Sequence, residues 1–208
     1  MSRPPLTDRT TDREHQRADG RWRTVDIVVT ATLGVAFGIV FWAWGLVWNG
    51  TAAAFAVLPP VQGLLYGVWF VPGVLAGLVV RRPGVAFLAA FTAALVSALL
   101  GSSWGTTALL YGVAQGLAPE AVFALGRYRR FGPATAVAAA AATGVVAATM
   151  DLIGYYPAWT SGWKAWYVAT VCLSGAVVAG LGSWWLARTL ASTGVLSSFP
   201  AGRDQARV

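Results

Sequence analysis

Six apolar runs alternate with short polar breaks along most of the chain. The breaks are rich in Gly, Pro, Ser or Arg, the residues that end helices and form turns. The runs cover about 26–48, 61–80, 84–101, 105–126, 134–157 and 165–190. A helix needs about 20 apolar residues to cross the hydrocarbon core of a bilayer. The pattern therefore predicts an all-α integral membrane protein with six transmembrane helices.

The charged residues indicate an orientation for these helices. Of the 208 residues, 57% are hydrophobic and only 11% are charged, against about 25% charged in soluble domains. If the N-terminus is inside, 14 of the 15 Lys and Arg residues fall on the inner side, and only Lys164 lies outside. The net charge of +7 thus reflects topology rather than nucleic-acid binding. We expect a multi-pass protein of the cell membrane, surrounded by lipid, with both termini in the cytoplasm.

The chain divides into one membrane domain and two tails. Residues 1–24 mix both signs of charge with Pro and Gly and contain few apolar residues, so we expect a disordered cytoplasmic tail. The six-helix domain covers 25–191, and a cytoplasmic C-terminal tail covers 192–208.

The aromatic residues gather on the side opposite to the positive charge. With the N-terminus inside, 8 of the 11 Trp residues and five of the 6 Tyr residues fall in the outer half. An interfacial belt accounts for part of this excess, but such belts form at both interfaces. The remainder predicts an aromatic chamber that opens outward and suits a flat or cationic ligand. The candidate ligand-binding aromatics are Trp48, Tyr66, Trp69, Trp104, Tyr111, Tyr155 and Trp166.

Three polar side chains lie within the apolar runs. Asp151 lies one helical turn before Tyr155 and is a candidate partner for an organic cation or an aminopyrimidine; the alternative is a helix–helix hydrogen bond or an interfacial cap. Gln115 lies one turn after Tyr111 and is a candidate for the polar floor of the chamber. Glu120 lies nearer the cytoplasm, where an ion pair with Arg127 or snorkelling competes with a role in ligand binding or coupling.

Two further features are candidates for contact with a partner. Thr30, Gly34 and Gly38 form a small-residue face in the first run, which allows close packing of helices either within the bundle or against another membrane protein. Arg81 and Arg82 occupy an inner break. We class all five as candidate partner-facing residues.

The sequence gives no sign of catalysis. GSSWG at 101–105 matches the G-x-S-x-G pattern of serine hydrolases, but the single histidine, His15, lies in the N-terminal tail, so the base is missing. The sequence has no P-loop and no metal-ligand cluster. We therefore predict a protein that is not an enzyme and has no cofactor or metal. A binding component that depends on partners for energy is the leading interpretation; a self-sufficient small transporter or channel for an organic cation, or a purely structural membrane protein, are the alternatives.

Three segments strongly resemble the YkoE family, the substrate-binding S components of energy-coupling factor (ECF) transporters. They are LLYGVWFVPGVLAGLVVRRPGVAF, GSSWGTTALLYGVAQGLAPEAVFALGRYRRFG and RTLASTGVLSSFPAGR, and the similarity extends over about 25–203. The resemblance implies the six-helix S-component fold, with a pocket for thiamine or its hydroxymethylpyrimidine precursor near the extracellular face. It also implies a transmembrane coupling (T) component and ABC-type ATPase subunits as partners.

Overall fold

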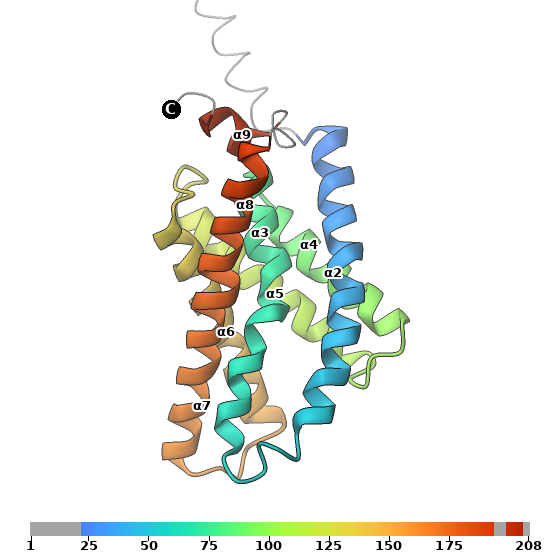
Figure 1. Ribbon diagram of the computed structural model, residues 1–208, viewed down its shortest axis with the longest axis vertical. Coiled ribbons are helices and arrows are strands. Elements are labelled where there is room, and N and C mark those ends of the chain that lie inside the picture. Colours follow the sequence, from blue (N-terminus) through green and yellow to red (C-terminus); the bar gives the residue numbers. More distant parts are fainter. Residues whose placement is uncertain (1–21, 194–198, 206–208) are drawn as a thin grey trace, which may run out of the picture.

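The computed structural model describes residues 22–193 and 199–205, and these residues form helices joined by short turns (Figure 1). The elements are α2 (Thr24–Thr51), η1 (Pro59–Phe70), α3 (Val71–Val80), α4 (Val85–Leu99), α5 (Thr107–Leu125), α6 (Pro133–Gly154), α7 (Ser161–Ser174), η2 (Gly175–Leu181), α8 (Gly182–Ser192) and α9 (Pro200–Gln205). Residues 1–21 of the predicted disordered tail lie outside the described residues. Of the predicted C-terminal tail, the structure describes only 192–193 and 199–205, which include α9.

All six predicted runs form helices, and five of them are long and apolar enough to cross a membrane. These five are Thr24–Thr51, Pro59–Val80, Thr107–Leu125, Pro133–Gly154 and Ser161–Ser192. The remaining run forms α4, which is apolar but has only 15 residues. A helix of that length extends about 22 Å, less than the roughly 30 Å of the hydrocarbon core. The helical membrane fold is thus confirmed for the described residues, and the count of six spans stays a prediction.

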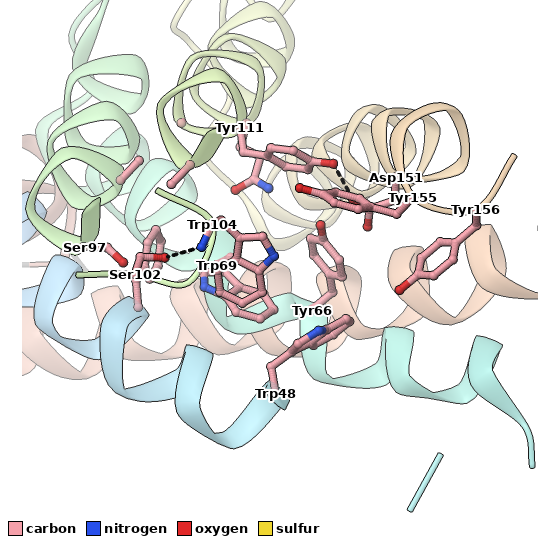
Figure 2. Close-up of a pocket in the computed structure, with 15 residues that line it drawn as sticks. Trp48, Tyr66, Trp69, Ser97, Ser102, Trp104, Tyr111, Asp151, Tyr155 and Tyr156 are labelled. Carbon is pink, nitrogen blue, oxygen red and sulfur yellow. Dashed lines mark hydrogen bonds between the residues drawn. The ribbon is translucent and has the colours of Figure 1, made fainter. Parts of the chain in front are cut away.

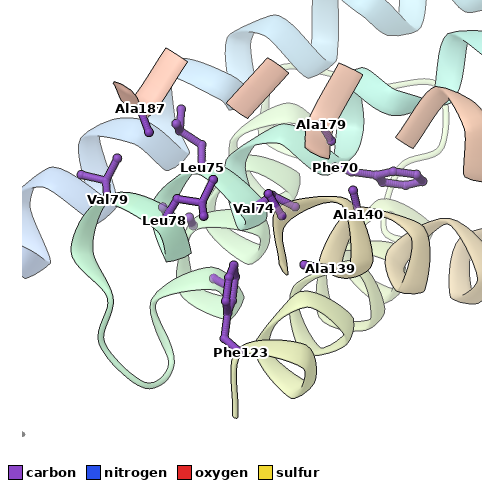
Figure 3. Packing of buried hydrophobic residues seen from close by; sticks show 14 of the residues in the cluster. Phe70, Val74, Leu75, Leu78, Val79, Phe123, Ala139, Ala140, Ala179 and Ala187 are labelled. Atoms are coloured by element: carbon purple, nitrogen blue, oxygen red, sulfur yellow. The ribbon is translucent and has the colours of Figure 1, made fainter. Parts of the chain in front are cut away.

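The helix α3 lies at the centre of the bundle. Its residues from Pro72 to Val80 are all buried, in keeping with a sequence that is apolar on every side. Its side chains pack against residues of η1, α5, α6, η2 and α8 (Figure 3). Because η1 continues directly into α3, this central position also places η1 against the other helices.

The small-residue face of α2 packs against α4. A Cβ atom added at Gly38 would lie 2.5 Å from the Cβ of Val96, and one added at Gly34 would lie 2.6 Å from the Cβ of Thr92. Thr30 on the same face is fully buried. The expectation that these three residues face a partner is therefore corrected: their small size lets α2 and α4 approach closely within the chain.

The two arginines that follow α3 also make contacts within the chain. The Nε of Arg82 lies 3.8 Å from a carboxylate oxygen of the buried Asp26, at the start of α2. The Arg81 guanidinium lies 4.8 Å from the centre of the Phe131 ring. Both arginines keep partial exposure, so their role toward a partner stays a prediction.

Candidate functional site

A cavity of about 130 Å³ lies among α2, η1, α4, α5 and α6, near the ends of α2 and α6 (Figure 2). Eight of its fifteen lining residues are aromatic, and one is charged. The lining consists of Phe41, Trp48, Tyr66, Trp69, Ala94, Ser97, Ser102, Trp104, Ala108, Tyr111, Gly112, Gln115, Asp151, Tyr155 and Tyr156. Such a concave, mostly apolar space with a few polar groups is typical of a small-molecule site.

One wall of the cavity is a cluster of four aromatic rings. Tyr66 and Trp69 come from η1, Trp48 comes from the end of α2, and Trp104 comes from the turn before α5. The rings meet edge to face: the centroid of Trp69 lies 5.2 Å from that of Tyr66, 5.3 Å from Trp48 and 5.6 Å from Trp104. This arrangement offers ring faces on which a flat ligand can stack and ring edges that it can meet edge to face.

The single charge in the cavity comes from Asp151 on α6. Its carboxylate accepts a hydrogen bond from the Tyr111 hydroxyl on one oxygen and from the Tyr167 hydroxyl on the other, the latter at 2.6 Å. The side chain of Asp151 is only 4% exposed. Both oxygens act as acceptors, so Asp151 brings a buried carboxyl group to an otherwise aromatic space.

Further polar groups surround this carboxylate. Gln115 is buried on α5 and lines the cavity one helical turn after Tyr111, as the sequence predicts. Tyr155 and Tyr156 directly follow α6. Burial raises the pKa of Tyr156, and the Asp151 carboxylate raises it further, so this hydroxyl stays protonated and can donate a hydrogen bond.

The cavity brings together eight of the nine predicted ligand-binding residues. Trp166 is the exception: it lies on α7, half exposed, and is not part of the lining. Sequence reasoning missed seven lining residues, which are Phe41, Ala94, Ser97, Ser102, Ala108, Gly112 and Tyr156. Tyr156 adjoins a predicted residue, but small side chains such as Ala94 carry no signal of their own. Ligand contact by any of these residues stays a prediction.

Glu120 lies apart from the cavity and caps another helix. Its carboxylate accepts hydrogen bonds from the backbone N–H of Gly84 at 2.6 Å and of Ala86 at 3.0 Å, at the start of α4. It also accepts a hydrogen bond of 2.5 Å from the Tyr128 hydroxyl. Burial and this bond both raise the pKa of Tyr128. The expected ion pair with Arg127 is replaced by a helix cap, because the N–H groups of the first turn of α4 need acceptors.

Comparisons with known proteins place the chain among membrane transport components. The family described as "ABC-type cobalt transport system, permease component" matches residues 25–146. The "Putative HMP/thiamine permease protein YkoE" of Bacillus subtilis (strain 168) is 30% identical over 184 residues, which cover 88% of this chain and 92% of that protein. A solved structure, "Crystal structure of an S-component of ECF transporter", matches with a TM-score of 0.86 at 30% identity. That match covers 90% of this chain and 94% of the other.

Proposed function

Because the chain belongs to the YkoE family of ECF-transporter S components, we propose that it captures thiamine or hydroxymethylpyrimidine in the cavity beside Asp151. In this proposal the N-terminus is cytoplasmic and the cavity opens outward. The position of the cavity supports this orientation, since it lies near the ends of α2 and α6, whereas Arg82 lies beside the start of α2.

The observation that carries the proposal is the pairing of a buried carboxylate with an aromatic wall. Thiamine joins a positively charged thiazolium ring to a flat aminopyrimidine. The wall of Tyr66, Trp69 and Trp104 offers stacking and cation–π contact, and Asp151 offers the opposite charge. Gln115 offers a carboxamide that can both donate to and accept from a pyrimidine ring.

The same lining favours an organic ligand over the metal ion named in the description of the matching family. Divalent transition metals bind sites that bring several imidazole, thiolate or carboxylate groups together. Among the described residues, no three His, Cys, Asp or Glu side chains come together in that way, and the cavity offers the single carboxylate of Asp151. Cobalt is therefore a control for the binding experiment.

Transport itself is assigned to partners. We propose that a T component and ABC-type ATPases supply the energy for uptake, while this chain supplies the ligand site. The alternative is a self-sufficient transporter or channel. Uptake by proteoliposomes that contain this chain alone separates the two hypotheses. A self-sufficient transporter or channel would take up labelled thiamine there, whereas a component that depends on partners would not.

The binding test is a titration of the purified protein in detergent, followed by tryptophan fluorescence. Trp48, Trp69 and Trp104 line the cavity, so a bound ligand should quench part of the emission. Thiamine, hydroxymethylpyrimidine, riboflavin and Co²⁺ are titrated separately. Saturable quenching by thiamine or the pyrimidine, without a response to riboflavin or Co²⁺, is the expected result. A response to Co²⁺ alone, or to none of the four, would refute the proposed ligand.

A further inference from the structure

The segment η1, which carries Tyr66 and Trp69, has an unusual backbone. It forms a 3₁₀ helix of 12 residues, from Pro59 to Phe70, although such helices rarely exceed 3–4 residues. Twelve residues extend about 24 Å as a 3₁₀ helix and about 18 Å as an α-helix. Residues three apart are eclipsed in a 3₁₀ helix, which aligns Tyr66 with Trp69 on the cavity wall. The position of these two rings therefore depends on this backbone form.

A side chain from α7 makes two hydrogen bonds to the backbone of this segment. The hydroxyl of Ser174 accepts a hydrogen bond of 2.9 Å from the N–H of Gly67 and donates one of 2.5 Å to the carbonyl of Leu64. Residues 64 and 67 are the pair that an i to i+3 backbone bond would join. The hydroxyl thus bridges the two backbone groups from outside, directly beside Tyr66.

The surrounding residues allow this close contact between α7 and η1. A Cβ atom added at Gly67 would lie 2.5 Å from the carbonyl oxygen of Ser174, so only glycine allows the two backbones to approach this closely. One turn earlier on α7, the Thr170 hydroxyl donates a hydrogen bond of 2.7 Å to the carbonyl of Pro60, at the start of η1. The α-helical part ends at Ser174, and the wider π-helical η2 begins at Gly175.

We propose that Ser174 is a positioning residue of the ligand site: its hydroxyl ties the backbone of η1 to α7 at Leu64 and Gly67 and so sets Tyr66 and Trp69 on the cavity wall. Ser174 is buried and does not line the cavity, so it acts through the backbone of η1. The effect on ligand affinity rests on the proposed function; the effect on the aromatic cluster does not.

The test compares Ser174→Ala with the wild-type protein by two readouts. The near-UV circular dichroism of the ligand-free protein reports the packing of aromatic rings, and the fluorescence titration gives the Kd for thiamine and for the pyrimidine. Without the hydroxyl, the backbone of η1 loses its two hydrogen bonds to α7 at Leu64 and Gly67, so the adjacent Tyr66 can shift. We expect an altered near-UV spectrum and a Kd about tenfold higher, the size of one hydrogen bond.

Two further variants separate positioning from general damage. Thr149→Ala removes a hydroxyl that donates only within its own helix, to Val145, so both readouts should match the wild type. Ser174→Cys fills the space of the hydroxyl with a weak hydrogen-bonding group and gives the same comparison if the alanine variant does not fold. The inference is overturned if a folded Ser174 variant keeps the wild-type spectrum, or if its spectrum changes while the Kd does not. If the wild type binds neither ligand, the proposed function fails and the spectra alone decide on Ser174.

Discussion

Replacing Asp151 with Asn removes the charge of the cavity and leaves its shape. The asparagine oxygen can still accept one of the two tyrosine hydroxyl protons, from Tyr111 or Tyr167, and its amide nitrogen can donate to the other hydroxyl. The polar contacts of the site are thus largely retained. The substitution tests whether the negative charge itself attracts the ligand.

The size of the effect follows from the burial of the carboxylate. Because Asp151 is 4% exposed, solvent screens it little. Two opposite charges about 6 Å apart, at an effective dielectric constant of about 20, attract each other by about 3 kcal/mol. A loss of that size raises the Kd for a cationic ligand by about 100-fold. A neutral ligand in the same cavity loses little.

The assay titrates wild type and Asp151→Asn with thiamine and with hydroxymethylpyrimidine, which lacks the thiazolium charge. We expect the Kd for thiamine to rise by about 100-fold and that for the pyrimidine by less than about threefold. Tyr167→Phe is the matched control, because it removes a hydrogen bond to Asp151 and retains the charge. It should weaken both ligands alike, by about tenfold or less.

Two results would refute this reasoning. An unchanged Kd for thiamine would mean that Asp151 does not act on the cationic ring. An equal loss for both ligands would mean that the substitution disturbs the cavity rather than its charge. The unfolding temperature of each variant is measured in the same detergent. It shows whether an equal loss of affinity for both ligands comes from a destabilised fold.

Three more predictions test other parts of the molecule. Thiamine phosphate should bind at least about tenfold more weakly than thiamine in the same titration, because its anionic group meets the carboxylate of Asp151. Gly38→Ala should lower the unfolding temperature by several degrees, because its Cβ atom would collide with Val96, whereas Gly50→Ala, with no atom within 4 Å, should not. Glu120→Ala should also lower the unfolding temperature, because loss of the helix cap costs about 2 kcal/mol of the free energy of unfolding. It should leave the Kd for thiamine unchanged. An equal effect of the two glycine variants, or a changed Kd for Glu120→Ala, would contradict these expectations.

The parts of the site that the sequence predicts are those whose chemistry is visible residue by residue. Trp69, Tyr111 and Asp151 belong to residue types that are costly or conspicuous in a membrane helix, so their excess on one side indicates a chamber. Ser97 and Gly112 line the same cavity, but small residues occur throughout membrane helices, and only their position across the bundle gives them a role.

Contacts between distant segments explain the rest. Closeness in sequence suggested Arg127 as the partner of Glu120. The fold instead brings the start of α4 to this carboxylate, including Gly84, which lies 36 residues earlier in the chain. The 3₁₀ form of η1 is likewise invisible in its sequence. The hydroxyl that bonds to its backbone beside Tyr66 comes from Ser174, which is 107 residues away from Gly67. Local patterns predict helices well, but they carry no information on which hydroxyl or carboxylate reaches a backbone group from another helix.

The hydrogen bonds around Asp151 bear on how a ligand meets this carboxylate. Each oxygen of Asp151 already accepts one tyrosine hydroxyl, from Tyr111 or Tyr167, and Tyr66 is a third hydroxyl partner of the same carboxylate. We therefore expect a cation to act on this carboxylate through its charge rather than by replacing one of its tyrosine partners. Recognition of ring nitrogens and amino groups then falls to Gln115 and the hydroxyls around it, while Asp151 contributes charge. This division explains why loss of the charge should separate the cationic ligand from the neutral one, whereas loss of ring positions, as in the Ser174 variants, should weaken both.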